Sequence, residues 1–231
     1  MIPIVKYPRT PHISGSRLQP GDEDVKVIAR ETLEGVSLIV EEKLDGSNCG
    51  ISFAPDGSLT LQSRGHVLTG GPRERQFDLL KRWASHHVAT LRDILGQRYV
   101  MYGEWLYARH TIPYDRLPHY FLEFDMLDRE SGDFLDTDAR RKLLAGGPVL
   151  SAPVLGLAPA SKIDTYIGKS RYSSTEMMEG LYLKREDDGR VIERFKYVRT
   201  DFLQAVANSD SHWMERPIEP NRLAEGVDPF A

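Results

Sequence analysis

The sequence predicts an α+β domain built on antiparallel sheets flanked by helices. Three observations lead to this prediction. Short segments rich in β-branched and aromatic residues recur along the chain, and some are separated by turns short enough for hairpins. Stretches with helical spacing of apolar residues lie between them. Mixed strands with interspersed helices favour an antiparallel architecture.

The first predicted strand covers residues 36–40, a short apolar run rich in β-branched residues. A hairpin follows it along the chain. Its strands are residues 49–53 and 59–63, joined by the turn 54–58. Arg64 is therefore expected at the far end of this hairpin.

The middle of the chain alternates helical and strand patterns. Apolar residues at helical spacing predict a helix within residues 73–88, and a second short helix is expected to end at Gly96. Two aromatic-rich segments, residues 99–106 and 120–127, are predicted to be central strands.

The last third contains two more short helices and a hairpin. Thr137 is predicted to be the N-cap of a helix that runs to about Leu144. Ser161 with Asp164 resembles the capping arrangement of another helix. The final hairpin is predicted from residues 179–185, the turn 186–189 and residues 191–196.

The composition is ordinary for a soluble globular protein. The chain has 231 residues, of which 40% are hydrophobic, and a formal net charge of -4 at pH 7. This charge does not attract a polyanion to the molecule as a whole, so any contact with nucleic acid needs a local basic surface. Residues 1–207 are predicted to form one domain that includes an N-terminal arm, and residues 208–231 an irregular C-terminal extension.

Neither a membrane span nor a secretory signal is indicated. No apolar run is long enough to cross a bilayer, and the N-terminus lacks the pattern of a signal peptide. The single Cys49 excludes an internal disulfide framework and favours a reducing compartment. A cytoplasmic location is therefore expected, with Cys49 as a small core residue.

Lys43 is the first candidate for chemistry, because it follows the predicted strand 36–40 and enters a turn that contains Gly46. A lysine held at the floor of a pocket is partly desolvated, which lowers its pKa and frees the amine for nucleophilic attack. The Lys-x-Asp-Gly pattern alone is also typical of a surface turn with a solvated lysine.

Further along the chain are polar and aromatic residues of the types that a lysine reacting with a nucleotide requires. Each also has a purely structural interpretation. Arg64 fits an exposed hairpin charge and Phe121 fits a core aromatic. Glu104 lies among strand residues, where a buried carboxylate needs a partner. Glu179 fits the start of a strand, and the cations of residues 194–196 fit a solvent-facing strand.

Taken in order, these segments resemble the motifs of the covalent nucleotidyltransferase superfamily of ATP-dependent ligases and mRNA capping enzymes. The segments are Lys43-Leu44-Asp45-Gly46, Ser63-Arg64-Gly65, Tyr102-Gly103-Glu104, residues 120–125, Glu179-Gly180-Leu181 and Arg194-Phe195-Lys196. The run Gly46-Ser47-Asn48 is similar to that of the RNA ligase 2 branch. The resemblance covers roughly residues 36–200.

The resemblance implies an ATP-grasp-like ligase adenylation fold, with ATP and Mg²⁺ as cofactors. It assigns catalysis to Lys43, Asp45 and Lys196, and it assigns a metal contact to Glu179. The residues that it assigns to nucleotide binding are Glu42, Lys43, Asn48, Arg64, Glu104, Phe121, Glu179, Arg194 and Lys196.

Individual roles also follow from the resemblance. Phe121 is expected to stack on adenine, Glu104 to accept a hydrogen bond from a ribose hydroxyl, and Arg64 to contact ribose or phosphate. Lys43 must lose a proton to attack the α-phosphate, and desolvation with Lys196, Arg194 and Mg²⁺ nearby is expected to lower its pKa. Arg194 stands where the family usually has lysine, and its planar guanidinium differs in geometry from an ammonium.

The implied activity is ATP-dependent joining of RNA 5′-phosphate and 3′-hydroxyl ends through a lysyl-AMP intermediate. The alternatives are a DNA ligase or capping-type nucleotidyltransferase, and a non-catalytic nucleotide-binding or RNA-binding module. Too few residues follow Lys196 for the OB domain of the DNA ligases and capping enzymes, and a protein partner is a possible replacement. The arm 6–17 has two open interpretations, RNA-phosphate binding and a rigid segment with solvated charges.

Overall fold

One strongly twisted sheet contains the strands of the computed structural model, which describes residues 4–19, 21–203 and 217–230. The strands in these residues are β1 (His12–Ile13), β2 (Val27–Ile28), β3 (Ser37–Lys43), β4 (Ser47–Phe53), β5 (Leu59–Ser63), β6 (Tyr99–Trp105), β7 (Phe121–Asp128), β8 (Phe134–Leu135), β9 (Leu150–Ser151), β10 (Val154–Pro159), β11 (Gly180–Asp187) and β12 (Arg190–Val198). The helices are η1 (Arg30–Leu33), η2 (Pro72–Phe77), α1 (Asp78–His86), α2 (Val88–Leu95), α3 (Thr137–Leu144) and η3 (Ala160–Tyr166), where η marks a 3₁₀ helix.

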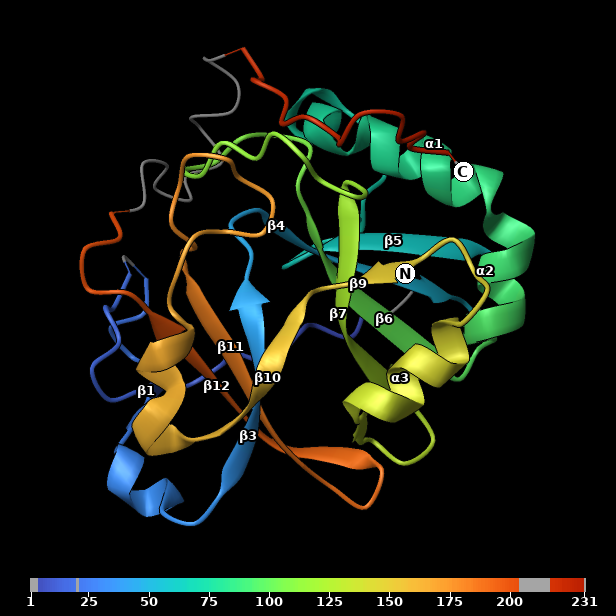
Figure 1. Cartoon of the computed structure of the whole chain (residues 1–231). Coiled ribbons are helices and arrows are strands. Elements are labelled where there is room, and N and C mark those ends of the chain that lie inside the picture. Colours follow the sequence, from blue (N-terminus) through green and yellow to red (C-terminus); the bar gives the residue numbers. More distant parts are fainter. Residues whose placement is uncertain (1–3, 20, 204–216, 231) are drawn as a thin grey trace.

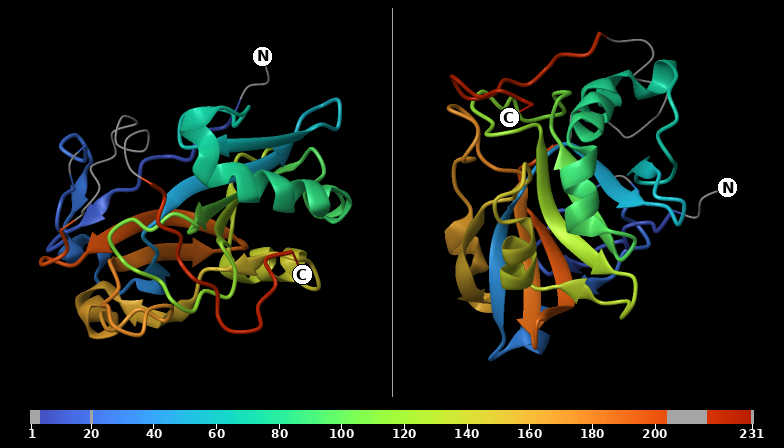
Figure 2. Two further views of the ribbon diagram at one scale, coloured as in Figure 1. Left: turned by 90° about the horizontal axis from the view of Figure 1, so that it is seen from above. Right: turned by 90° about the vertical axis from the view of Figure 1, so that its right-hand side faces the viewer.

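The sheet divides into two walls. Its strand order is β10-β3-β11-β12-β8-β7-β6-β4-β5, and every pair along this path is antiparallel. We call β10, β3, β11 and β12 the β3 wall, and β7, β6, β4 and β5 the β7 wall. The two walls splay apart, and α1 and α2 cover the outside of the β7 wall (Figures 1 and 2). The predicted antiparallel α+β class is confirmed.

Each wall has its own apolar core. Leu80, Trp83 and Leu91 from the two helices pack against strand residues such as Ile51 and Met101 of the β7 wall. Burial of this apolar surface is the main force that holds the helices on the sheet. A second cluster joins the β3 wall to η1 and η3. Cys49 is fully buried in the first cluster, as predicted.

The predicted strands are present, with boundaries shifted by a few residues. The strand predicted at residues 36–40 extends to Lys43 as β3, because residues 41 and 42 are also buried and paired with β11. The helix predicted within residues 73–88 begins as the 3₁₀ helix η2 and continues as α1, which ends at His86. The second helix ends before Gly96, as predicted.

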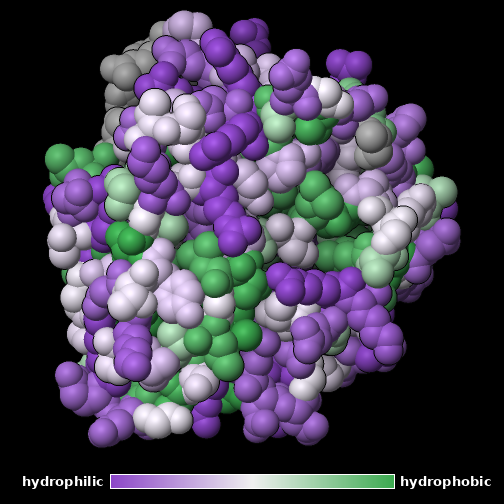
Figure 3. Space-filling view, viewed as in Figure 1, coloured by the Kyte–Doolittle hydropathy of each residue, from purple (hydrophilic) through white to green (hydrophobic). Residues whose placement is uncertain are grey.

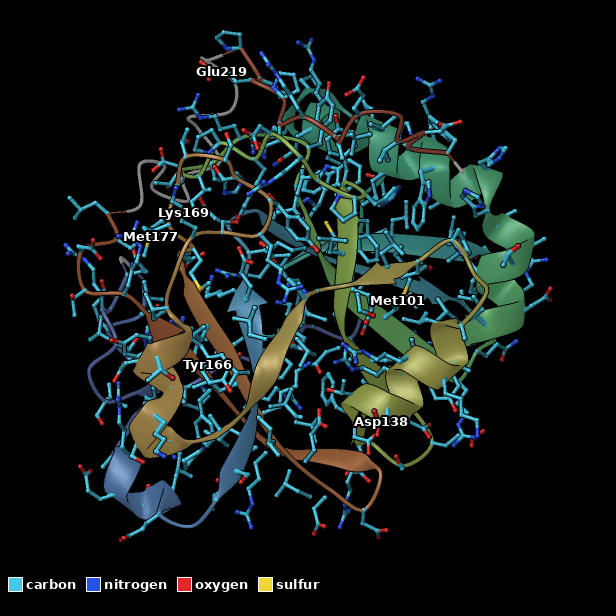
Figure 4. The ribbon with its side chains drawn as sticks, viewed as in Figure 1. Met101, Asp138, Tyr166, Lys169, Met177 and Glu219 are labelled. Carbon is cyan, nitrogen blue, oxygen red and sulfur yellow. The ribbon has the colours of Figure 1, made fainter. Side chains whose placement is uncertain are left out.

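Two predicted helix caps are wrong. Asp136, not Thr137, is the N-cap of α3, because its carboxylate accepts the backbone N–H of Ala139 at 2.8 Å. The start of η3 after Pro159 has no side-chain cap, since the Asp164 carboxylate pairs with Arg30 instead. Tyr166 of η3 lies beside β10 (Figure 4) and donates its hydroxyl to the Leu157 carbonyl at 3.3 Å.

A buried network of charges connects the two walls. Arg140 of α3 donates to Glu41 of β3 at 2.9 Å and to Glu123 of β7 at 2.7 Å. Lys184 of β11 lies 2.9 Å from Glu41 and 3.3 Å from Asp125 of β7. The acidic and basic side chains in this network alternate, so the buried charge is compensated locally.

The described part of the C-terminal extension runs along the body of the protein. Asn221 is buried and donates its amide to the Leu106 carbonyl at 2.8 Å, and its own amide oxygen accepts the Tyr114 N–H at 3.0 Å. Residues 208–216 of the predicted extension lie outside the described residues.

None of the described helices is long and apolar enough to cross a membrane.

The face of the molecule seen in Figure 1 is polar at its margins and apolar in the middle. Figure 3 shows this apolar area over β9 and β10. Leu150 of β9 and Leu157 of β10 are 45% and 61% exposed there. Most of the predicted site residues belong instead to the cavity between the walls.

Candidate active site

A cavity of about 1180 Å³ lies where the ends of the two walls meet the N-terminal arm. Most of the predicted site residues line it: Glu42, Lys43, Asp45, Asn48, Arg64, Glu104, Glu179 and Lys196. Phe121 and Arg194 do not line it. Concave sites of this size with converging charged groups are typical of ligand-binding pockets.

Lys43 is the last residue of β3, and its ammonium pairs with the Glu179 carboxylate at 2.7 Å. Residue 180 of β11 is paired in register with Lys43, so Glu179 directly precedes the partner strand. The Lys43 side chain keeps 25% of its surface exposed, whereas Glu179 keeps 6%. The nucleophile candidate is thus reachable from the cavity while its partner is enclosed.

The protein groups around Lys43 raise its pKa overall. Burial lowers this pKa, as the sequence suggested, but the carboxylates of Glu179, Glu104 and Asp45 raise it by more. The net shift is upward, because three negative charges favour the ammonium form. Lys43 is therefore a cation that pairs with Glu179.

Glu104 of β6 lies on the opposite wall from Glu179. One of its carboxylate oxygens accepts the Gly46 N–H at 3.1 Å. Burial raises the pKa of Glu104 to about 8, against the opposing charge of Lys43, and burial raises that of Glu179 to about 7. Gly46 itself has no room for a side chain, since a Cβ atom there would lie 2.6 Å from the Trp105 carbonyl oxygen.

Asp45 is buried and faces the loop that follows β6. Its carboxylate accepts the N–H groups of Thr111 and Ile112 at 2.7 and 2.9 Å, and its own N–H donates to the Tyr114 hydroxyl at 2.8 Å. These contacts fix the turn after Lys43. Asp45 therefore anchors the segment that follows Lys43 and adds negative charge beside it.

Asn48 and Arg64 come from the two strands of the first hairpin. Asn48 of β4 is paired in register with Glu104, which brings its side chain to the same part of the cavity. Arg64 follows β5 and is exposed, and its charge lowers the pKa of Glu104. Both residues thus belong to the β7 side of the site.

Glu42 and Lys196 make side-chain contacts on opposite sides of the β3 wall. The Glu42 carboxylate accepts the Ser170 hydroxyl at 2.6 Å and the Arg171 N–H at 3.1 Å, so it is engaged by the loop before β11. Lys196 of β12 donates at 2.7 Å to Asp22, which lies between β1 and β2; from here on, the N-terminal arm means the described residues before β2. Burial lowers the pKa of Lys196, and Lys43 lowers it further.

The position of Phe121 corrects the predicted adenine contact. Phe121 is fully buried in the core beneath the helices, with its ring 5.7 Å from that of Trp83. The aromatic residue of β7 that lines the cavity is Phe124. The β6–β7 register moves from Tyr102↔Asp125 to Gly103↔Glu123, so Phe124 is the extra residue of a bulge.

Arg194 is also placed away from the cavity. Its guanidinium carbon lies 3.6 Å from the centre of the Phe134 ring, and its Nε atom lies 3.6 Å from the Asp125 carboxylate. Burial lowers the pKa of Arg194, but Tyr7 and Asp125 raise it by more, so this pKa is raised overall. Arg194 therefore supports the wall behind the cavity, and the predicted nucleotide contact does not follow from its position.

Among the cavity residues that sequence reasoning did not assign to the site are Tyr7, Asp22 and Tyr182. Tyr7 of the arm reaches between the walls, where its hydroxyl hydrogen bonds with Asp125 and Tyr182. The alternation of β11 offers a signal for Tyr182, because it shares a strand face with Gly180, the residue paired with Lys43. No local pattern brings the arm into the cavity.

Comparisons with known proteins point to one family. A family model described as RNA ligase matches residues 36–198. The search of curated proteins finds no match. Among solved structures, an archaeal ATP-dependent RNA ligase is 20% identical with a TM-score of 0.59, and the match covers 85% of this chain and 48% of that chain.

A variant of the Naegleria gruberi RNA ligase, solved with ATP and Mn, is 19% identical with a TM-score of 0.58. That match covers 85% of this chain and 56% of the other. The chain thus spans about half the length of these solved structures. At such identity the likeness shows the fold, and it confirms the predicted ligase nucleotidyltransferase architecture.

Proposed function

Since the chain belongs to the RNA ligase family, we propose that it is an ATP-dependent RNA ligase that works through a lysyl-AMP intermediate. In the first step the Lys43 amine bonds to the α-phosphate of ATP and pyrophosphate leaves. The AMP then passes to an RNA 5′-phosphate, and an RNA 3′-hydroxyl displaces it to form the phosphodiester.

One observation supports this proposal above the others. Lys43 opens into a cavity with Glu179 at 2.7 Å, and the carboxylate of Glu104 and the ammonium of Lys196 line the same cavity. A primary amine between carboxylates and a second cation is suited to attack on a phosphate whose negative charge needs stabilisation. A solvated turn, the alternative interpretation of the Lys-x-Asp-Gly pattern, does not explain this enclosure.

ATP and Mg²⁺ are the proposed cofactors. Mg²⁺ usually keeps several waters and takes one or two carboxylates together with substrate phosphates. Glu179 fits that requirement as a single carboxylate ligand, and the described residues contain no cluster of three or more His, Cys, Asp or Glu that would form a metal cage. When bound, the cation supplies charge neutralisation for the phosphate oxygens.

Lys43 must lose a proton before it reacts, and its present surroundings oppose this. Glu179 is the strongest of the groups that hold the proton on Lys43. A cation bound to the Glu179 carboxylate would remove this effect, and Lys196 would then disfavour a second ammonium nearby. We infer that nucleotide and metal binding lowers the pKa of Lys43 within the assembled site.

The base and the ribose also have proposed contacts in the cavity. Phe124 and Tyr182 offer aromatic surface for adenine, with their ring centres 5.8 Å apart. Glu104 is proposed to accept a ribose hydroxyl, and Arg64 to contact ribose or phosphate. Asn48 is proposed to contact the reacting phosphates.

RNA is proposed to approach along the basic rim of the cavity. The cavity lining includes the basic residues Lys6, Arg9, Arg64 and Arg73, so a local positive surface exists although the whole chain is acidic.

Cys49, the only cysteine, is free and buried, which supports a reducing compartment such as the cytoplasm.

The test is covalent labelling with ATP that carries a radioactive α-phosphate, in the presence of Mg²⁺. The wild type is expected to form an adduct that Lys43→Ala abolishes, because the amine is the attacking group. Lys162→Ala, which removes an exposed lysine of η3, is the matched control and should label normally. Absence of any wild-type adduct would favour a non-catalytic binding module.

Two further measurements separate the enzymatic alternatives. Labelling by GTP in place of ATP would favour a capping-type activity. Sealing assays with RNA and DNA strands that carry either 5′-phosphate or 5′-hydroxyl ends then test the substrate. The proposal expects joining of RNA ends only when a 5′-phosphate meets a 3′-hydroxyl.

A further inference from the structure

The N-terminal arm is built into the strand that carries Lys196. β1 pairs in parallel with β12, with His12 opposite Lys196, and the Lys196 N–H donates to the Pro11 carbonyl at 2.8 Å. The arm then turns back, and the Asp22 carboxylate accepts the Lys196 ammonium at 2.7 Å. Backbone and side chain of Lys196 are therefore both held by the arm.

A continuous chain of hydrogen bonds orients Asp22. Its Oδ2 atom also contacts His12 Nε2 at 2.9 Å, and His12 Nδ1 contacts the Ser16 hydroxyl at 2.6 Å. Ser16 in turn accepts the Val198 N–H at 2.9 Å. A carboxylate only accepts, so Nε2 donates to Asp22, and Ser16 is free to donate to Nδ1.

This chain is enclosed, which makes its geometry well defined. His12 is fully buried, and the side chains of Asp22 and Lys196 keep only 14% and 17% of their surface exposed. Charge-assisted hydrogen bonds in such surroundings are stronger than those in open water. An exposed pair of the same type would hold Lys196 only weakly.

Asp22 also offsets two effects that disfavour a charged Lys196. Burial and the nearby Lys43 lower the pKa of Lys196, while the hydrogen bond from Lys196 to Asp22 raises it. Without Asp22, two ammonium groups would share the cavity with less compensation. The second cation of the site thus depends on a residue outside the matched segment 36–198.

We propose that Asp22 and His12 are positioning residues that hold the Lys196 ammonium at the phosphate end of the cavity. Asp22 acts directly on Lys196, and His12 acts by orienting Asp22. The role of Lys196 toward phosphate rests on the proposed ligase function, whereas its placement by the arm does not.

The first experiment measures this placement without any activity. The protein is treated with a trace of acetic anhydride at pH 8, and acetylation of Lys196 and Lys162 is compared by mass spectrometry. Asp22→Asn is expected to increase labelling of Lys196 about 10-fold relative to Lys162, because the loss of a charge-assisted hydrogen bond lowers its pKa and frees the amine. Equal labelling in Asp22→Asn and wild type would overturn the proposal.

Asp24→Asn is the matched control, since it makes the same change two residues away. Asp24 is 76% exposed and pairs with Arg9, not with Lys196. Its substitution is expected to leave the labelling ratio within about 2-fold of wild type, as for a weak surface ion pair. If Asp24→Asn raised the labelling ratio as much as Asp22→Asn does, the effect would come from any charge change in the arm. That result would contradict a specific role for Asp22.

The second experiment follows the rate of lysyl-AMP formation in a double-mutant cycle. Asp22→Asn is expected to slow the step about 10-fold to 100-fold, and to add little in a Lys196→Ala background, because both changes remove the same interaction. Additive losses, or a faster Asp22→Asn enzyme, would contradict positioning.

His12 gives an independent check on the same chain. His12→Gln retains a side-chain N–H for Asp22 and is expected to stay within a few-fold of wild type, whereas His12→Leu should behave like Asp22→Asn. Equal defects in the two variants would contradict the proposed hydrogen bond. If the wild type forms no adduct, the ligase proposal fails, and the acetylation ratio still decides whether the arm positions Lys196.

Discussion

Lys43 and its two carboxylates show how a single residue depends on its neighbours. The sequence identified Lys43, Glu104 and Glu179 correctly as cavity residues. The position of Lys43 after a strand and the order of the family motifs can both be recognised without a structure. The direction of the Lys43 pKa shift was not predictable, since it depends on distances between strands far apart in sequence.

The acidic pair predicts how stability depends on pH. The pKa values of Glu104 and Glu179 are about 8 and about 7 in the folded state, above the ordinary value of 4.5. From about pH 4.5 to about pH 8, the folded protein therefore binds more protons than the unfolded chain. Its free energy of unfolding falls as the pH rises through this range. The fall is at most about 1.4 kcal/mol per pH unit for each group.

Glu104→Gln removes one of these groups. Thermal unfolding from pH 4.5 to 8.5, without nucleotide or metal, should show the wild type losing stability relative to the variant as pH rises. Parallel curves for the two proteins would contradict the raised pKa of Glu104.

The two aromatic residues of β7 predict opposite phenotypes. Phe124→Leu is expected to weaken AMP binding about 10-fold, because stacking of a base on an aromatic ring contributes about 1–3 kcal/mol. Phe121→Leu is expected to lower the free energy of unfolding by about 1 kcal/mol and to leave AMP binding unchanged. Titration calorimetry and urea unfolding of both variants test this, and the reverse pattern would restore Phe121 as the base contact.

At the scale of elements, the sequence predicted seven of the twelve described strands and their hairpins, with shifted ends, and it missed β10 and the four strands of two residues. The period of apolar residues defines a strand or helix over many positions, whereas a cap depends on one side chain. The bulge at Phe124 could not be predicted, because it requires the register of β6 against β7. The seating of the arm against β12 is likewise a long-range pairing without a local signal.

The N-cap of α3 gives a prediction at this scale. Asp136→Ala should lower the free energy of unfolding by about 1 kcal/mol, because the Ala139 N–H loses its acceptor. Asp136→Asn keeps an acceptor and should cost much less. Asp138→Ala is the neighbouring control. Asp138 is exposed in the first turn of α3 (Figure 4), where the interaction of its charge with the helix dipole stabilises the helix only weakly. A larger loss for Asp138→Ala than for Asp136→Ala would refute the cap.

At the scale of the whole molecule, Arg140 joins the walls through buried ion pairs with Glu41 and Glu123. The sequence contains no signal for this, because Arg140 lies on a short helix far along the chain from Glu41. A buried arginine with two acidic partners is decided by tertiary structure alone.

Arg140→Ala is therefore expected to lower the free energy of unfolding by about 3–5 kcal/mol, since it leaves two buried carboxylates without their partner. Arg141→Ala, on the adjacent and less buried position of α3, should change it by less than about 1 kcal/mol. Denaturant unfolding at pH 7 measures both, and similar values for the two variants would contradict a joining role.

The strand β8 is only two residues long, yet within the described chain the main path of the sheet passes from one wall to the other through it. Its backbone is paired with β12 at two positions and with β7 at one. This short strand pairing offers little resistance to bending of the sheet. The angle between the walls is therefore set by the side chains packed between them. The width of the cavity mouth is thus a property of packing, and a change in that packing alters this width before it disrupts either wall.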